Sequence, residues 1–272
     1  MNNNNIDLFR NYNMASHNIK YNYLKSRTNQ TMDFVEKMHT IFNNFDTKME
    51  IWDILEQLNS FTDMSDPDIS IPNLYHAFQT AEMMRADNQP DWMQLIGLLH
   101  DIGKIMYIKG NDEDGTGIHQ QWAIVGDTFA VGCKLPDTLI FSEFNQYNPD
   151  MKNDQYNTTL GIYKKECGLD NVLFSWGHDE YLYKILDSNK NPNILPPEAL
   201  YIIRFHSLYA YHNRSSYMYF QSEKDKTFFH WLKVFNTYDL YSKTDTIYEY
   251  NTLKEYYMKL IQKYFQNTYL YI

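Results

Sequence analysis

Apolar residues recur at intervals of three and four along most of this chain, which is the spacing of amphipathic helices that bury one face. The stretches with this spacing cover residues 31–45, 48–61, 73–86, 91–105, 175–188, 195–212, 226–243 and 252–265. The pattern therefore predicts an all-α protein.

Local signals mark where several of these helices begin. Asn73 follows Pro72 and is a candidate N-cap, and Asp91 with Gln94 three residues later has the arrangement of a capping box. Pro197 stands where the first turn of a helix accommodates proline. We therefore expect helices to start at these three points.

Two segments lack the helical pattern. Residues 109–121 are rich in glycine and acids, so we expect an exposed loop whose acidic run is a solvated surface. Residues 144–168 carry turn-forming residues throughout, and a loop this long within a compact domain is often functional. No linker rich in Gly, Ser or Pro divides the chain, which predicts a single domain over residues 31–272 after a polar segment over residues 1–30.

Composition narrows the classes of function. A net charge of −10 without a dense Lys/Arg cluster argues against a protein that binds nucleic acid or a membrane surface, and a small-molecule substrate fits better. No apolar stretch approaches the roughly 20 residues that cross a bilayer. Cys133 and Cys167 lack metal-ligand spacing, so we expect core or loop thiols. Two cysteines without such spacing, together with an N-terminus that lacks the apolar core of a secretory signal, favour a cytoplasmic protein. We expect it to be monomeric.

The stretch "GLLHDIGK", residues 97–104, places His100 and Asp101 directly after an apolar run. A buried aspartate without a partner costs several kcal/mol, so this carboxylate needs a cation or hydrogen-bond donors, unless the pair ends a surface helix. Imidazole and carboxylate together suit iron, manganese or zinc, and a bridging carboxylate lets two cations lie close together. The pair is therefore a candidate metal site.

Other side chains of the same kind stand on separate predicted helices. His76, His178 and His206 are flanked by aromatic or apolar residues, and so is Asp239. Each histidine taken alone is more often a neutral core residue, but with the His–Asp pair the set matches what a two-metal site in a helical bundle needs. Lys104, four residues after His100, shares its helical face and can reach a substrate oxygen.

The motif "LLHDIGK", with a histidine on an earlier helix and a later aspartate, resembles the HD-domain superfamily of helical, metal-dependent proteins. The longer stretches "DPDISIPNLYHAFQTAE", "QWAIVGDTFAVGC", "NVLFSWGHDEYLY", "IIRFHSLYAYH" and "FNTYDLYSK", in this order, closely resemble the myo-inositol oxygenase family, the iron-dependent branch of that superfamily. The resemblance extends from "DLFRNY" nearly to the C-terminus.

This resemblance implies a single-domain HD-domain-like bundle with two non-haem irons, a mixed-valent Fe(II)/Fe(III) pair that uses O2 as co-substrate. The implied reaction is the ring-opening, four-electron oxidation of myo-inositol to D-glucuronate. On the matching positions, the implied iron ligands are His76, His100, Asp101, His178, His206 and Asp239, with Asp101 as the bridge.

The family pattern also implies a substrate site and a lid. Lys104 and Asp101 would act in catalysis. The implied polyol-binding residues are Arg10, Asp63, Ser65, Lys104, Gly126, Asp127, His206, Ser207 and Lys243. The segment of residues 1–30 would cover the substrate, with Arg10 donating to its hydroxyls and with Phe9 and Tyr12 as apolar anchors.

The chain departs from the family pattern in two places, and two other functions stay open. The segment 105–122 looks longer than its counterpart, and Met64 replaces a polar residue between Asp63 and Ser65. Asp179 matches no family ligand, and no motif supports a role for His17, His39, His119, His212 or His230. The alternatives are an HD-domain phosphohydrolase, since four-histidine phosphohydrolases exist, and a catalytically idle binding protein that keeps the fold.

Overall fold

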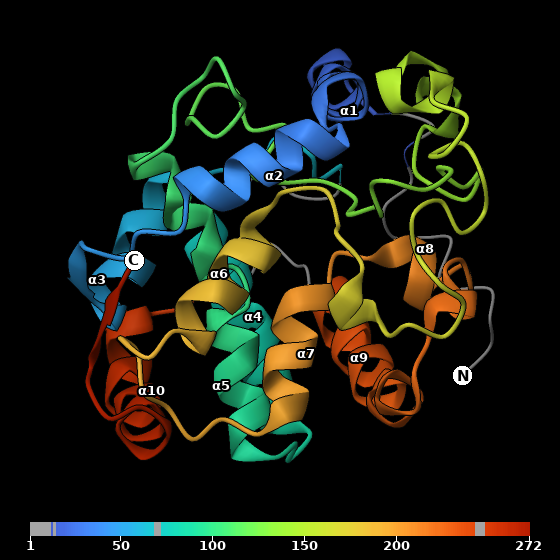
Figure 1. Ribbon diagram of the computed structural model, residues 1–272. Helices are drawn as coiled ribbons and strands as arrows, with labels where there is room; N and C mark the ends of the chain where they lie inside the picture. Colours follow the sequence, from blue (N-terminus) through green and yellow to red (C-terminus); the bar gives the residue numbers. More distant parts are fainter. Residues whose placement is uncertain (1–11, 13–14, 68–71, 243–247) are drawn as a thin grey trace.

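The computed structural model describes residue 12 and residues 15–67, 72–242 and 248–272, and in this part of the chain the fold is all-α, as predicted (Figure 1). The α-helices are α1 His17–Asn29, α2 Met32–Ile41, α3 Ile51–Gln57, α4 Asn73–Ala86, α5 Asp91–Leu99, α6 His178–Asp187, α7 Pro197–Phe205, α8 Tyr209–His212, α9 Glu223–Tyr241 and α10 Tyr250–Tyr264. The short 3-10 helices are η3 Leu58–Ser60, η4 Ile102–Ile108, η5 Ser142–Tyr147, η6 Pro149–Lys152, η7 Leu169–Asn171 and η8 Met218–Phe220.

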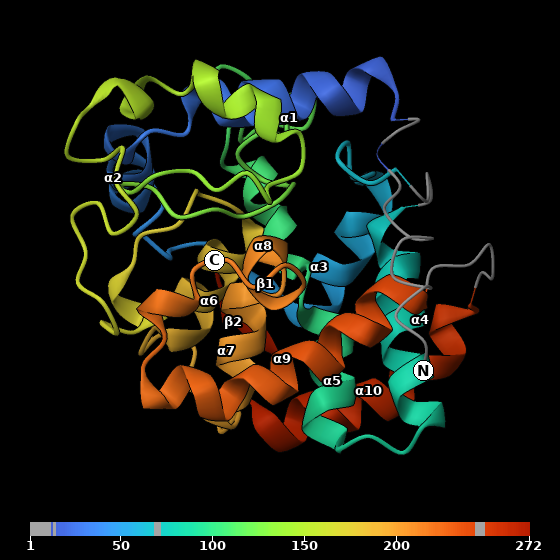
Figure 2. The same ribbon diagram turned by 90° about the vertical axis from the view of Figure 1, so that its right-hand side faces the viewer.

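The bundle is organised around the hairpin of α4 and α5. Helix α7 packs on α5, α6 and α9, and α10 closes the far side of α5. Figures 1 and 2 both show α1 at one end of the molecule and α5, α9 and α10 at the other. Leu95, Leu99 and Phe78 are completely buried between these helices. Burial of such side chains stabilises the fold by about 1.5 to 3 kcal/mol each, which is why the apolar stripes dictate the arrangement.

A glycine allows α4 and α5 to approach closely. A Cβ atom at Gly97 would lie 3.0 Å from both the Cα atom of Ala81 and the Sδ atom of Met84. The small residues at positions 81 and 97 therefore bring the two backbones together, as close helix packing requires. His76 on α4 and His100 just after α5 lie at the same end of this contact, and their rings consequently meet edge-to-face.

A second apolar cluster lies beneath the long loops. It includes Phe129, Tyr211, Tyr217 and Phe220, all fully buried. The predicted loop over residues 144–168 covers this cluster without an α-helix of its own. Cys133 is buried here and neither cysteine is in a disulfide, so the expectation of core or loop thiols is confirmed.

Several predicted boundaries differ from the structure. The helix predicted over residues 48–61 is wrong at its start, because β1 (Lys48–Glu50) pairs antiparallel with β2 (Tyr269–Tyr271). The pattern over residues 195–212 is broken between α7 and α8. Helix α1 was not predicted, since the side chains that it buries include Asn22, Ser26 and Arg27. Long-range pairing and buried polar groups explain these differences.

Of the three helix starts predicted from local sequence signals, one is confirmed as predicted and two differ in their caps. Pro197 does begin α7, as predicted. Asn73 and Asp91 lie inside their helices rather than at the cap, since Pro72 and Pro90 occupy the cap positions and no side-chain cap is formed. The predicted capping box of Asp91 and Gln94 is therefore wrong.

Residues 109–121 form a compact loop rather than a fully exposed one. Asn111, Asp112 and Glu113 are exposed as expected, but Thr116 is completely buried. The side chain of Asp112 accepts hydrogen bonds from the backbone amides of His119 and Gln120. The acidic run thus shapes the loop.

Among the described residues, no helix combines the length and the apolar character that crossing a bilayer requires.

Candidate metal centre

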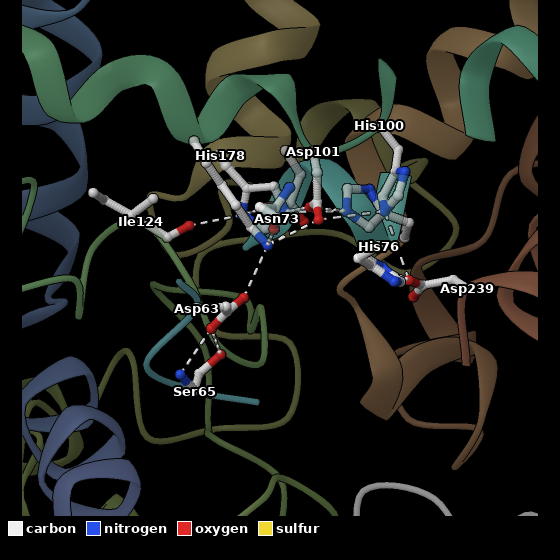
Figure 3. Close-up of polar contacts among 12 residues, drawn as sticks. Asp63, Ser65, Asn73, His76, His100, Asp101, Ile124, His178 and Asp239 are labelled. Carbon is white, nitrogen blue, oxygen red and sulfur yellow. Dashed lines mark hydrogen bonds and ion pairs between the residues drawn. The ribbon is translucent and has the colours of Figure 1, made fainter. Parts of the chain in front are cut away.

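Six side chains converge in the middle of the bundle, and five of them are labelled in Figure 3. His76 lies on α4, His178 begins α6, and Asp239 lies on α9. His100 and Asp101 follow the last residue of α5, where the chain passes into η4. On a regular helix, adjacent side chains point about 100° apart and do not easily reach the same centre. The change of helix type at this junction lets both side chains do so. His206 follows α7 in the same way.

The ligand atoms of these residues lie close together. The Nε2 atom of His76 is 2.9 Å from Oδ1 of Asp239, and Nε2 of His100 is 3.5 Å from Oδ2 of Asp101. On the other side, Nε2 of His178 is 3.1 Å from Oδ1 of Asp101. All six residues are buried, with at most 7% of the surface of any one exposed.

Two groups of candidate ligands share one residue. His76, His100 and Asp101 form the first group, and Asp101, His178 and His206 form the second. Asp239 joins the first group through its contacts with His76 and with His100, whose Nε2 atom lies 3.6 Å from Oδ1 of Asp239. The two oxygens of Asp101 thus face different groups, which is the arrangement of a carboxylate that bridges two cations.

Backbone carbonyls orient three of the histidines. Nδ1 of His100 donates to the carbonyl of Gly97 at 2.9 Å, Nδ1 of His178 to Ile124 at 2.7 Å, and Nδ1 of His206 to Ile203 at 2.8 Å. A neutral imidazole that donates through Nδ1 presents a lone pair at Nε2. The Nε2 atom of His100 is buried without a hydrogen-bond partner among the described residues. This donor set therefore fits transition-metal ions, for which such second contacts are typical.

Charges around the centre reinforce this fit. Burial alone would raise the pKa of Asp101, but the Lys104 ammonium and His100 hold it well below its usual range. In Asp239, burial also works to raise the pKa, but the neighbouring imidazoles of His100 and His76 hold it well below that range. Both carboxylates are therefore ionised, as metal ligands must be.

Lys104 links the centre to a neighbouring pocket. Its Nζ atom donates to Oδ2 of Asp101 at 2.9 Å, to Oδ2 of Asp63 at 2.9 Å and to Oδ1 of Asn73 at 2.7 Å. Burial would lower the pKa of Lys104, but Asp101 and Asp63 raise it above its ordinary value. Burial would raise the pKa of Asp63, but Lys104 and Ser65 lower it to about 2. The three N–H groups of the ammonium are thus all used.

The pocket opens to solvent, and its lining is predominantly polar. Its lining comprises Asp63, Ser65, Asp66, Asn73, His76, Asp101, Lys104, Gly126, His178, His206, Ser207, Tyr209 and Asp239. Gly126 has a φ of 116°, which disfavours any residue with a Cβ atom. A small molecule with many hydroxyl groups would meet both donors and acceptors here.

Most of the predicted substrate residues line this pocket, but some do not. Asp127 turns its Oδ2 atom toward the amide of Ile140, which donates to it at 3.1 Å, and lines a smaller cavity behind the pocket. Arg10 and Lys243, as well as Phe9, lie outside the described residues. Asn73 and Tyr209 also line the pocket and were not predicted as site residues. The signal for Asn73 was its position three residues before His76 on the same predicted helix, a spacing that shares a helical face. Tyr209 begins α8, after the break that follows His206, and had no such signal.

The segment that carries Gly126 is hydrogen-bonded to His178 and to the residues that follow His178 and His206 in the chain. The amide of Thr128 donates to the carbonyl of Ser207 at 3.0 Å, and its hydroxyl donates to Oδ2 of Asp179 at 3.1 Å. The amide of His178 in turn donates to the carbonyl of Ile124 at 3.0 Å. Asp179, which matched no family ligand, therefore joins the pocket wall to α6.

A helical bundle with a buried, adjacent histidine and aspartate, of which the aspartate is shared between two groups of candidate metal ligands, defines an HD-domain-like protein with a candidate metal centre. The family model of myo-inositol oxygenase matches residues 16–271. The chain belongs to the myo-inositol oxygenase family, as the sequence motifs indicated.

Curated relatives agree over most of their length. The inositol oxygenase of Dictyostelium discoideum is 43% identical over 267 residues, which are 96% of this chain and 89% of the relative. That of Danio rerio is 44% identical over 245 residues, 89% of this chain and 84% of the relative. That of Homo sapiens is also 44% identical over 245 residues, 89% of this chain and 82% of the relative.

Proposed function

We propose that this protein is an inositol oxygenase that opens the ring of myo-inositol with dioxygen and forms D-glucuronate. The observation that carries the proposal is the pair of ligand groups that share Asp101 beside a polar pocket, in a chain of this family. The reaction balances as C6H12O6 plus O2 giving C6H10O7 and H2O. The four electrons lost by two carbons reduce one dioxygen molecule, and one of its oxygen atoms leaves as water.

The proposed cofactor is a pair of non-haem irons in a mixed-valent Fe(II)/Fe(III) state. His76, His100 and Asp239 would hold one ion, His178 and His206 the other, and Asp101 would bridge them. When bound, this pair would supply the redox chemistry that activates dioxygen and would lower the pKa of a coordinated substrate hydroxyl. The described residues fit the pair because every Nε2 atom and both carboxylates face the same centre.

The chain itself would bind and orient the polyol. Asp63 offers acceptor oxygens, and the hydroxyls of Ser65 and Ser207 donate or accept. Lys104 would hydrogen-bond a substrate oxygen, which requires it to release one of its three present acceptors. Asp63 is the natural one to be released, because its side chain is 20% exposed and that of Asp101 only 5%. Arg10, Asp127 and Lys243 remain proposed substrate residues.

The polar N-terminal segment of residues 1–30 is proposed to cover the bound substrate and exclude water. Within its described part, Tyr12 packs edge-to-face on Tyr23 and Phe141, with ring centroids 5.5 Å apart in both pairs. The hydroxyls of Tyr12 and Tyr23 lie 2.9 Å apart. These contacts support Tyr12 as an anchor. We also propose that the protein is cytoplasmic and monomeric.

The proposal is tested by measuring oxygen uptake and glucuronate formation together, with iron-loaded protein and myo-inositol. We expect one glucuronate per dioxygen consumed. Phosphate release from phosphate esters without oxygen uptake would instead establish the phosphohydrolase alternative. Absence of both reactions in iron-loaded protein would favour the idle binding protein.

A further inference from the structure

Asn73 lines the pocket, although its position after Pro72 predicts a helix cap. It is the first residue of α4 and lies one turn before His76, so both point to the same side of the helix. Only 3% of Asn73 is exposed, and its side chain lines the pocket beside Lys104 (Figure 3).

The orientation of the Asn73 amide follows from its neighbour. The ammonium of Lys104 has only donors, so the Asn73 atom 2.7 Å from it is the oxygen Oδ1. The amide nitrogen Nδ2 must then point away from Lys104. It is buried and has no hydrogen-bond partner among the described residues. Buried donors are nearly always paired, so this one needs an acceptor that the described side chains do not supply.

We propose that Asn73 is a substrate-binding residue that donates through Nδ2 to a hydroxyl oxygen of the polyol, while its Oδ1 atom holds Lys104 in place. The inference rests on the proposed function, because it takes a polyol as the occupant of the pocket. A polyol hydroxyl suits the position because it can accept from Nδ2 and at the same time donate to a nearby carboxylate such as Asp63. Asn73 would thereby favour ligands that carry a hydroxyl group at one particular position of the ring.

The test uses Asn73→Asp, which keeps an acceptor for Lys104 and removes the donor. Affinity for myo-inositol is measured by calorimetry on iron-loaded protein without oxygen, and KM and kcat are measured with oxygen. We expect affinity to fall about tenfold and KM to rise by a similar factor, as loss of one hydrogen bond in a closed site predicts. Asn145→Asp is the matched control, since Asn145 is buried outside the pocket and donates through Nδ2 to the carbonyl of Pro136.

Mono-deoxy inositols then separate a direct contact from an indirect one. With the unaltered protein, removal of the hydroxyl that Asn73 contacts should weaken binding about tenfold. With Asn73→Asp, or with Asn73→Ala if the aspartate variant does not fold, the same removal should cost almost nothing further. Equal affinity and KM in the variant and the unaltered protein, or a deoxy penalty that persists at every position, would overturn the assignment. If the unaltered protein itself binds no myo-inositol, the proposed function fails instead.

Discussion

The Nε2 atoms of His178 and His206 lie 3.0 Å apart in the buried centre. Each ring donates through Nδ1 to a backbone carbonyl, so two neutral rings would point lone pairs at each other. A cation, or a proton on one ring, removes this repulsion. Oδ1 of Asp101 lies 3.1 Å from the first nitrogen and 3.9 Å from the second, which completes a site of two imidazoles and one carboxylate.

We predict two irons per chain in protein expressed with iron. The two ligand groups that meet at Asp101 provide a place for each ion. Metal analysis by mass spectrometry, together with the protein concentration, gives the ratio. Removing the metal with a chelator should lower the melting temperature, because a ligand that binds only the folded state stabilises it. A single tightly held zinc would contradict the di-iron proposal.

Replacing Asp101 with alanine should lower the iron content below one per chain. The carboxylate serves both ligand groups, and without it the repulsion between two cations is less compensated. Asp239→Ala is the matched variant, because Asp239 contacts only the first group, and it should keep about one iron. Equal losses in the two variants would argue against a bridging role.

Lys104→Met should lower turnover by about tenfold to a hundredfold while the irons still assemble. A charged hydrogen bond is worth about 1.5 to 3 kcal/mol, and the ammonium would make it where charge develops on the substrate. Lys109→Met is the control, since Lys109 pairs with the exposed Asp46. Steady-state rates and iron content are compared for the two variants. Unchanged kinetics in Lys104→Met would remove this residue from the reaction.

The pair of Asp63 and Lys104 predicts a defined dependence of stability on pH. The pKa of Asp63 is lowered to about 2, so its stabilisation is complete above the ordinary value of 3.8 and is lost as the pH falls towards 2. Asp63→Asn should therefore reduce the free energy of unfolding by about 2 kcal/mol near neutral pH. Urea unfolding between pH 7 and pH 3 tests this. The difference from the unaltered protein should stay constant down to pH 5 and shrink below about pH 4. A difference that changes between pH 7 and pH 5 would assign the stabilisation to another group.

Deleting residues 1–12 should spare folding and iron binding but weaken the coupling of oxygen to substrate. Closure of a lid must offset about 1 to 2 kcal/mol for each residue that it orders, so it depends on contacts with the substrate. We expect a higher KM for inositol and more oxygen consumed than glucuronate formed. Tyr12→Phe, which removes only the hydroxyl next to Tyr23, should have a smaller effect. An unaltered KM with one glucuronate per oxygen in the truncated protein would show that the segment is only a tail.

The sequence predicted the convergence of the six candidate ligands better than it predicted local structure. Each histidine alone is more often a neutral core residue, but four histidines and two aspartates with apolar neighbours are informative as a set, because buried polar groups need partners. Asn73 was predicted to be a helix cap because an asparagine after a proline is typical of a helix start. Its contact with Lys104, which connects it with the pocket, is not visible in the sequence. The strand at residues 48–50 depends on residues 269–271, a pairing that no local pattern contains. Helix α1 was not predicted because the side chains that it buries include Arg27 and Asn22, so the sequence shows no apolar stripe there.

The separation between His76 on α4 and His100, the residue that follows α5, is influenced by a contact outside the centre. Their ring centroids lie 5.4 Å apart, and a methyl group added at Gly97 would lie 3.0 Å from the Cα atom of Ala81, so the two helices would have to shift by a few tenths of an ångström. Gly97 also supplies the carbonyl that orients His100. The close packing of these small residues thus sets the spacing between two of the candidate metal ligands. Anyone wishing to adapt this scaffold to larger ions would start with positions 81 and 97 and leave the ligands untouched.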